Sequence, residues 1–116
     1  IRGIPVQIGG TSYVPPLPIE TVVIERIDEI RSQDKEPIEI AIELCMYCMK
    51  TQVFKDGNKR ASVIFANHYL IAQGMGFLVI PEKDVPEFKK LLVQYYEGEP
   101  LEVIGAFLKE RCWKNF

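Results

Sequence analysis

The sequence predicts an all-α protein, a compact bundle of about five helices preceded by one N-terminal β-hairpin. Most of the chain repeats apolar side chains at the three- and four-residue spacing of helices that bury one face. Glycine and proline clusters separate these runs, and two short β-prone segments flank Gly9-Gly10. The chain has no internal repeat, low-complexity segment or sign of a second domain, so we expect one domain over 1–116.

The hairpin is expected within residues 1–17. Segments 4–8 and 11–14 are rich in residues that favour strands, and the prolines from Pro15 to Pro18 end the second segment. A two-stranded hairpin alone is only marginally stable in water. We therefore expect it to pack on the helices or to accept a further strand along its edge.

The helical core is expected over 18–116. Its five helices are predicted at about 19–32, 36–50, 58–73, 84–96 and 100–113. The second is apolar nearly all round and should be buried. The third is expected to carry seven side chains into the centre, namely Val63, Ile64, Phe65, Ala66, Tyr69, Leu70 and Ile71.

Two local patterns predict where these helices begin and end. Gly74 and Gly76 end the third helix, because glycine takes the backbone conformation that a helix end requires. Asp84, with Glu87 three residues later, resembles a capping box that starts the fourth helix. Between them, residues 77–81 are expected to be extended.

Composition limits the classes of function. The 116 residues are 47% hydrophobic and 26% charged, as in ordinary globular proteins, and the net charge of −2 argues against a broad nucleic-acid or membrane surface. No apolar run reaches the ~18 residues of a transmembrane helix. The chain begins with Ile1 rather than methionine, which suggests a domain cut from a longer protein.

Three cysteines, an odd number, argue against a disulfide framework and for a reducing, cytoplasmic setting. Cys45 and Cys48 have the spacing of zinc ligands, but they lie in an apolar helical run, where buried thiols are the commoner explanation. Only Cys112 and His68, the single histidine, could complete four ligands.

The polar segment 52–60, QVFKDGNKR, is the most informative about function. Gly57 can take positive φ, and Asn58 can start the next helix, which leaves backbone N–H groups free at its positive end. Together with Lys59 and Arg60, these groups suit an anion such as a nucleotide phosphate. Asp56 supplies the carboxylate oxygen that a bridging Mg²⁺ prefers. A capped helix start with two solvated basic residues would have the same pattern.

This segment resembles the signature of the Fic/Doc family, His-x-Phe-x-Asp/Glu-Gly-Asn-Gly/Lys-Arg. Phe54 and residues 56–60 match it, and Gln52 stands where the family has its histidine. Residues 8–18 resemble the family's flap hairpin and the proline-rich entry to its next helix.

The resemblance implies a Fic-like bundle that binds ATP and Mg²⁺. Asp56 would be the magnesium ligand, whereas Gly57, Asn58, Lys59 and Arg60 would form the phosphate site. A target protein would dock on the flap hairpin, and an antitoxin-like or inhibitory segment is a further expected partner.

The resemblance also bears on the reaction. Fic proteins typically transfer AMP from ATP to a protein hydroxyl, whereas the Doc branch, with lysine at the position of Lys59, transfers the terminal phosphoryl group. Val63 stands where the AMP-transferring branch usually has a second arginine. Gln52 occupies the catalytic position, but its amide cannot accept the hydroxyl proton. Losing a general base slows a reaction by about 10²- to 10⁴-fold.

Three functions therefore remain open from the sequence. The first is a nucleotide-binding domain related to protein adenylyltransferases, with transferase activity impaired by Gln52. The second is an active Doc-like phosphotransferase, since phosphoryl transfer depends mainly on positioning and charge stabilisation. The third is a non-enzymatic module that binds a partner protein.

Overall fold

The computed structural model describes residue 15 and residues 18–51 and 58–114, and this part of the chain is mostly helical, as predicted. Its helices lie close to their expected positions. They are α1 (Glu20–Arg31), α2 (Pro37–Thr51), α3 (Asn58–Ala72), α4 (Val85–Tyr96) and α5 (Leu101–Phe107), which continues as a π-helical turn, η2 (Leu108–Cys112). The predicted hairpin and the segment 52–57 lie outside the described residues, apart from Pro15, which is buried.

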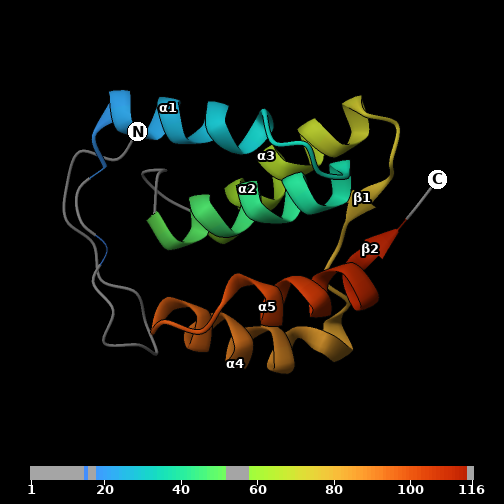
Figure 1. Ribbon diagram of the computed structural model, residues 1–116. Coiled ribbons are helices and arrows are strands. Elements are labelled where there is room, and N and C mark those ends of the chain that lie inside the picture. Colours follow the sequence, from blue (N-terminus) through green and yellow to red (C-terminus); the bar gives the residue numbers. More distant parts are fainter. Residues whose placement is uncertain (1–14, 16–17, 52–57, 115–116) are drawn as a thin grey trace.

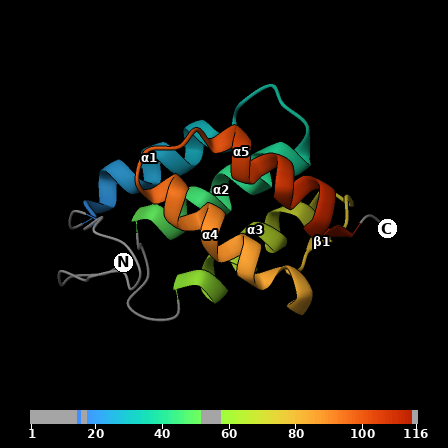
Figure 2. The same ribbon diagram turned by 90° about the horizontal axis from the view of Figure 1, so that it is seen from below.

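Helix α2 lies at the centre of the bundle. Figure 1 shows α1 on one side of the α2 and α3 pair, with α4 and α5 on the other side, and Figure 2 shows α4 and α5 from below. The helix contacts α1, α3 and α5, and it packs most extensively against α3. Neighbours around most of its circumference explain why its sequence is apolar nearly all round. Its buried residues are Ile38, Ile40, Ala41, Ile42, Leu44, Cys45, Met46, Cys48 and Met49.

Helix α3 buries a narrower stripe than the sequence predicted. Ser62, Ala66 and Leu70, spaced four residues apart, are fully buried. The predicted burial of Ile64 and Ile71 is wrong, since they are 68% and 51% exposed. Helix α3 packs mainly against α2, so no described helix covers the residues on its outer face, although their side chains are equally apolar.

A small two-stranded sheet joins the end of the chain to the segment after α3. Strand β1 (Phe77–Leu78) pairs antiparallel with β2 (Trp113–Lys114). The Val79 N–H donates to the Cys112 carbonyl at 2.9 Å, and the Trp113 indole N–H donates to the Met75 carbonyl at 2.7 Å. This sheet is distinct from the predicted N-terminal hairpin, and it confirms the extended connection expected near residue 77.

The glycines after α3 have the predicted role. Gly74 and Gly76 have φ values of 71° and 94°, in the region where a side chain would strain the backbone. The chain can therefore leave α3 and turn directly into β1.

Asp84 is the N-cap residue of α4, as predicted, but it does not form the predicted capping box. The Asp84 side chain makes no capping hydrogen bond, and its backbone is helical (φ −97°, ψ −4°) rather than extended as at a typical N-cap. A 3₁₀ turn, Glu82–Asp84, precedes the helix. The buried Asp84 carboxylate instead accepts a hydrogen bond from the Arg111 guanidinium at 3.3 Å, which connects α4 to the C-terminal segment.

Cys45, Cys48 and Cys112 are buried free thiols. Burial raises the pKa of all three, to about 12 for Cys48 and about 11 for Cys112. Thiols of this kind react slowly because the thiolate is the nucleophile.

Within residues 18–51 and 58–114, no helix is both long enough and apolar enough to cross a lipid bilayer.

Two adjacent residues of α3 test this account of the core. We expect Leu70→Ala to lower the free energy of unfolding by about 2–5 kcal/mol, because it leaves a cavity at a fully buried site. Ile71→Ala, at an exposed site, should change it by less than about 1 kcal/mol. Urea unfolding of both variants measures the difference, and equal losses would contradict the packing described for α3.

Candidate functional site

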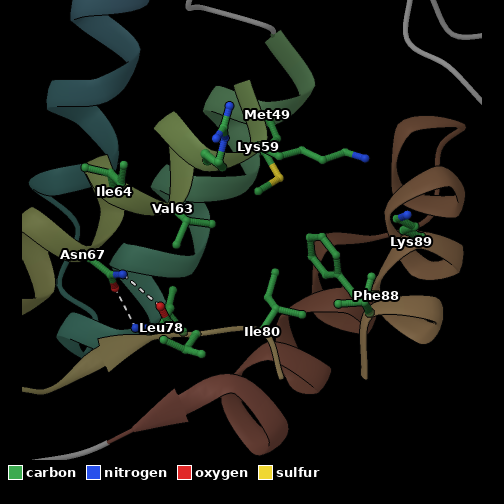
Figure 3. Close-up of a pocket in the computed structure, with 12 residues that line it drawn as sticks. Met49, Lys59, Val63, Ile64, Asn67, Leu78, Ile80, Phe88 and Lys89 are labelled. Carbon is green, nitrogen blue, oxygen red and sulfur yellow. Dashed lines mark hydrogen bonds between the residues drawn. The ribbon is translucent and has the colours of Figure 1, made fainter. Parts of the chain in front are cut away.

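A pocket of about 470 Å³ lies beside the start of α3. Its walls come from the end of α2, one face of α3, the segment from β1 to Ile80, and α4 (Figure 3). The volume is in the range of small-molecule sites. The lining residues are Met49, Lys59, Arg60, Val63, Ile64, Asn67, Leu78, Val79, Ile80, Val85, Phe88 and Lys89.

The walls of the pocket are largely apolar. Leu78 and Phe88 are almost fully buried and belong to the same core cluster as Met49. In Figure 3, Ile80 and Phe88 lie across the open space from Lys59. Walls that are part of the core are rigid, so they can orient a flat apolar group without first having to become ordered.

Three basic residues surround this apolar space. Lys59 and Arg60 are exposed in the first turn of α3, and Lys89 is exposed on α4. Figure 3 shows the Lys59 side chain extending across the pocket toward α4. None of the described lining residues is acidic, and the first turn of α3 contains no Asp or Glu. The charges and the helix dipole therefore both favour an anion at this end of the pocket.

Asn67 holds one wall of the pocket in place. Its side-chain N–H donates to the Leu78 carbonyl at 2.9 Å, and its side-chain oxygen accepts from the Leu78 N–H at 2.6 Å. The carboxamide thus replaces a neighbouring strand along the free edge of β1. This contact connects β1 directly to α3, the helix that carries Lys59 and Arg60.

The structure places some of the predicted site residues and not others. Lys59 and Arg60 line the pocket, and α3 begins at Asn58, as predicted. Gln52, Asp56 and Gly57 lie outside the described residues.

Of two further α3 residues that the sequence had singled out, only one lines the pocket. His68 is exposed and is not one of the described residues that line the pocket. Val63, at the position where the AMP-transferring branch usually has arginine, does line it.

Most of the residues that line the pocket were not predicted from the sequence, among them Asn67, Ile80, Phe88 and Lys89. The isolated polar Asn67 within an apolar run was a signal, because a polar residue there needs a hydrogen-bond partner. Ile80, Phe88 and Lys89 gave no comparable signal, since their positions depend on how β1 and α4 fold back against α3.

Comparison with known proteins identifies the family. A sequence model of the Fic/DOC family matches residues 2–70, more than half of the chain. The chain belongs to the Fic/DOC family. Neither the curated proteins nor the solved structures gave a match.

The family match covers only part of the residues that line the pocket. It includes α1, α2 and most of α3, with Lys59, Arg60 and Asn67. The opposite wall, from Leu78 to Lys89, lies beyond the matched range. The family match therefore gives no information about the ligand contacts of that wall, which depend on the residues of this chain.

Substitutions at Asn67 distinguish the two hydrogen bonds that its side chain forms with the Leu78 backbone. We expect Asn67→Ala and Asn67→Asp each to destabilise the domain by about 1–3 kcal/mol, because each leaves the Leu78 carbonyl without its donor. Only Asn67→Asp keeps an acceptor for the Leu78 N–H. Amide hydrogen exchange at Leu78 should therefore be fast in Asn67→Ala and slower in Asn67→Asp. Equal exchange in wild type and Asn67→Ala would contradict the contact.

Proposed function

We propose that this Fic/DOC domain binds ATP with Mg²⁺ at the start of α3 and that its transferase activity is impaired by Gln52. The observation that carries the proposal is the position of Lys59 and Arg60, which join the positive end of α3 to a largely apolar pocket. A nucleotide has the matching chemistry, an apolar ring at one end and a polyanion at the other.

The phosphates would lie against the first turn of α3. Lys59 and Arg60 offer charged donors there, and the helix dipole adds to their attraction. The base would lie deeper, between the apolar side chains of Val63, Ile80 and Phe88.

Magnesium binding in this proposal rests on Asp56. None of the described lining residues is a carboxylate, and the residues expected to hold phosphate are basic. Asp56 would hold Mg²⁺ with the nucleotide, and the metal would supply neutralisation of phosphate charge. The residues of the chain would supply position and electrostatic stabilisation around it.

Impaired transfer follows from the chemistry of residue 52. A target hydroxyl must lose a proton when it attacks a phosphorus atom, and a glutamine amide is not basic near neutral pH. We propose that the target protein docks on the flap hairpin within residues 1–17, as the family resemblance implies. Any remaining activity would depend on positioning and charge alone.

A second function, Doc-like phosphoryl transfer, is favoured by two observations. Lys59 extends across the pocket, in space that the glycine of the AMP-transferring branch would leave open (Figure 3). A filled space at this position is the reason to favour the Doc-like nucleotide orientation over the one used for AMP transfer. Val63, which cannot bind phosphate, points to the same branch.

Calorimetric titration with ATP and Mg²⁺ tests the binding site. We expect Lys59→Ala and Arg60→Ala each to weaken ATP binding about tenfold or more, because each removes a charged donor to phosphate. Both residues are exposed, so the stability loss should be less than about 1 kcal/mol.

Lys90→Ala is the matched control, because Lys90 is exposed on α4 next to Lys89 but does not line the pocket. It should bind ATP as the wild type does. An equal loss in Lys90→Ala would indicate non-specific charge attraction, and a wild-type protein that binds no ATP would exclude the proposal.

Gln52→His tests whether the base is the missing component. We expect this variant to gain about 10²-fold or more in protein labelling, since the other groups of the site are present. Lys59 predicts a larger gain with γ-labelled than with α-labelled ATP. If the variant binds ATP and Mg²⁺ but labels no protein with either, the domain is an interaction module.

A further inference from the structure

The extended segment 78–80 forms part of the pocket wall, and its backbone groups have different hydrogen-bond partners on its two edges. On one edge, the Val79 N–H donates to the Cys112 carbonyl in the C-terminal segment. On the other edge, the Leu78 N–H and carbonyl both bond the Asn67 side chain on α3. Successive residues of an extended chain direct these groups to opposite sides.

Ile80 follows the same alternation. Its N–H and carbonyl are therefore directed to the edge that Leu78 presents to α3. The residue before a proline favours extended backbone, and Pro81 itself is extended, with φ −60° and ψ 145°. The alternation seen at Leu78 and Val79 thus continues through Ile80.

No described residue bonds the Ile80 N–H or carbonyl. Val63 lies one helical turn before Asn67 on the same face of α3. Its side chain has no hydrogen-bonding group, so it cannot bond Ile80 as Asn67 bonds Leu78. Both Val63 and Ile80 line the pocket. By this alternation, the donor and acceptor of the half-buried Ile80 are directed toward the side of the pocket where Val63 lies, and a ligand with matching groups could bond both.

We propose that the backbone N–H and carbonyl of Ile80 recognise the adenine base of the bound nucleotide. This inference rests on the proposed function and identifies the part of the site that reads the base. Adenine N1 would accept from the Ile80 N–H, and the 6-amino group would donate to the Ile80 carbonyl. The Asn67 carboxamide satisfies Leu78 with the same adjacent acceptor and donor, so the wall already binds one planar group of this kind.

An added peptide strand fits this edge poorly. Strand addition uses backbone groups at several alternate residues. Here Leu78 is occupied by Asn67, and Glu82, the next residue after Ile80 in this alternation, already belongs to the 3₁₀ turn. The open edge is one residue long, which suits a small planar ligand flanked by apolar side chains such as Phe88.

Two substitutions at Ile80 provide a matched test. Ile80→Pro removes the N–H and is compatible with extended backbone, whereas Ile80→Val keeps the N–H and a similar apolar side chain. Each variant would be titrated with ATP and with inorganic tripolyphosphate. We expect Ile80→Pro to weaken ATP binding about five- to tenfold, as for loss of one hydrogen bond, and Ile80→Val to change it by less than about threefold. Neither variant should change tripolyphosphate binding.

Wild-type protein provides a second measurement that needs no substitution. Purine riboside triphosphate, which is ATP without its 6-amino group, lacks the donor to the Ile80 carbonyl. It should bind about five- to tenfold more weakly than ATP. The inference is overturned if this analogue binds as tightly as ATP, or if a folded Ile80→Pro variant binds ATP as Ile80→Val does.

The same titrations separate this inference from the proposed function. If wild-type protein binds tripolyphosphate as tightly as ATP, the proposed phosphate site is supported and recognition of the base is contradicted. Wild-type protein that binds neither would reject both.

Discussion

The packing of α3 against α2 is the constraint on which the rest of the structure depends. Ala66 and Leu70 are fully buried in the cluster that contains Met46 and Met49 of α2. Burial of one stripe determines which residues of α3 face outward and where its first turn lies. Lys59 and Arg60 are thereby held at the pocket by a helix that cannot rotate without exposing its core face.

The opposite wall depends on polar contacts as well as on burial. Asn67 joins β1 to α3, the short sheet joins β1 to the C-terminal strand, and Arg111 joins the π-helical turn to Asp84. These contacts hold the segment from Leu78 to Lys89 in place as one wall of the pocket. The opposite wall, from α2 and α3, belongs to the part of the chain that the family model matches. The basic residues of α3 and the apolar wall near Phe88 thus come from different parts of the chain.

Much of the fold could be predicted because helical periodicity is a local property. The bounds of α2 and α3 followed from apolar spacing and from the glycines after Gln73. The same spacing could not distinguish Ala66 from Ile71, because both are apolar and only the neighbouring helices decide which side is covered. The Asp84 capping box failed for a similar reason, since a distant residue, Arg111, binds the carboxylate.

The candidate site was predictable in part. Lys59 and Arg60 could be named from the sequence because their role depends on a local feature, the start of a helix after a glycine. Phe88 and the backbone of Ile80 could not be named, because they reach the site through the turn after α3 and the pairing of β1 with β2. In particular, the side chain of a residue does not reveal whether its backbone N–H and carbonyl are hydrogen-bonded, because that depends on the fold around it.

The most direct measurement is a crystal structure of the domain with Mg²⁺ and a non-hydrolysable ATP analogue. We expect phosphates at the first turn of α3, beside Lys59 and Arg60, with the base against Phe88 and its edge at the Ile80 backbone. A nucleotide bound elsewhere on the domain, or phosphates that make no contact with this turn, would contradict this expectation.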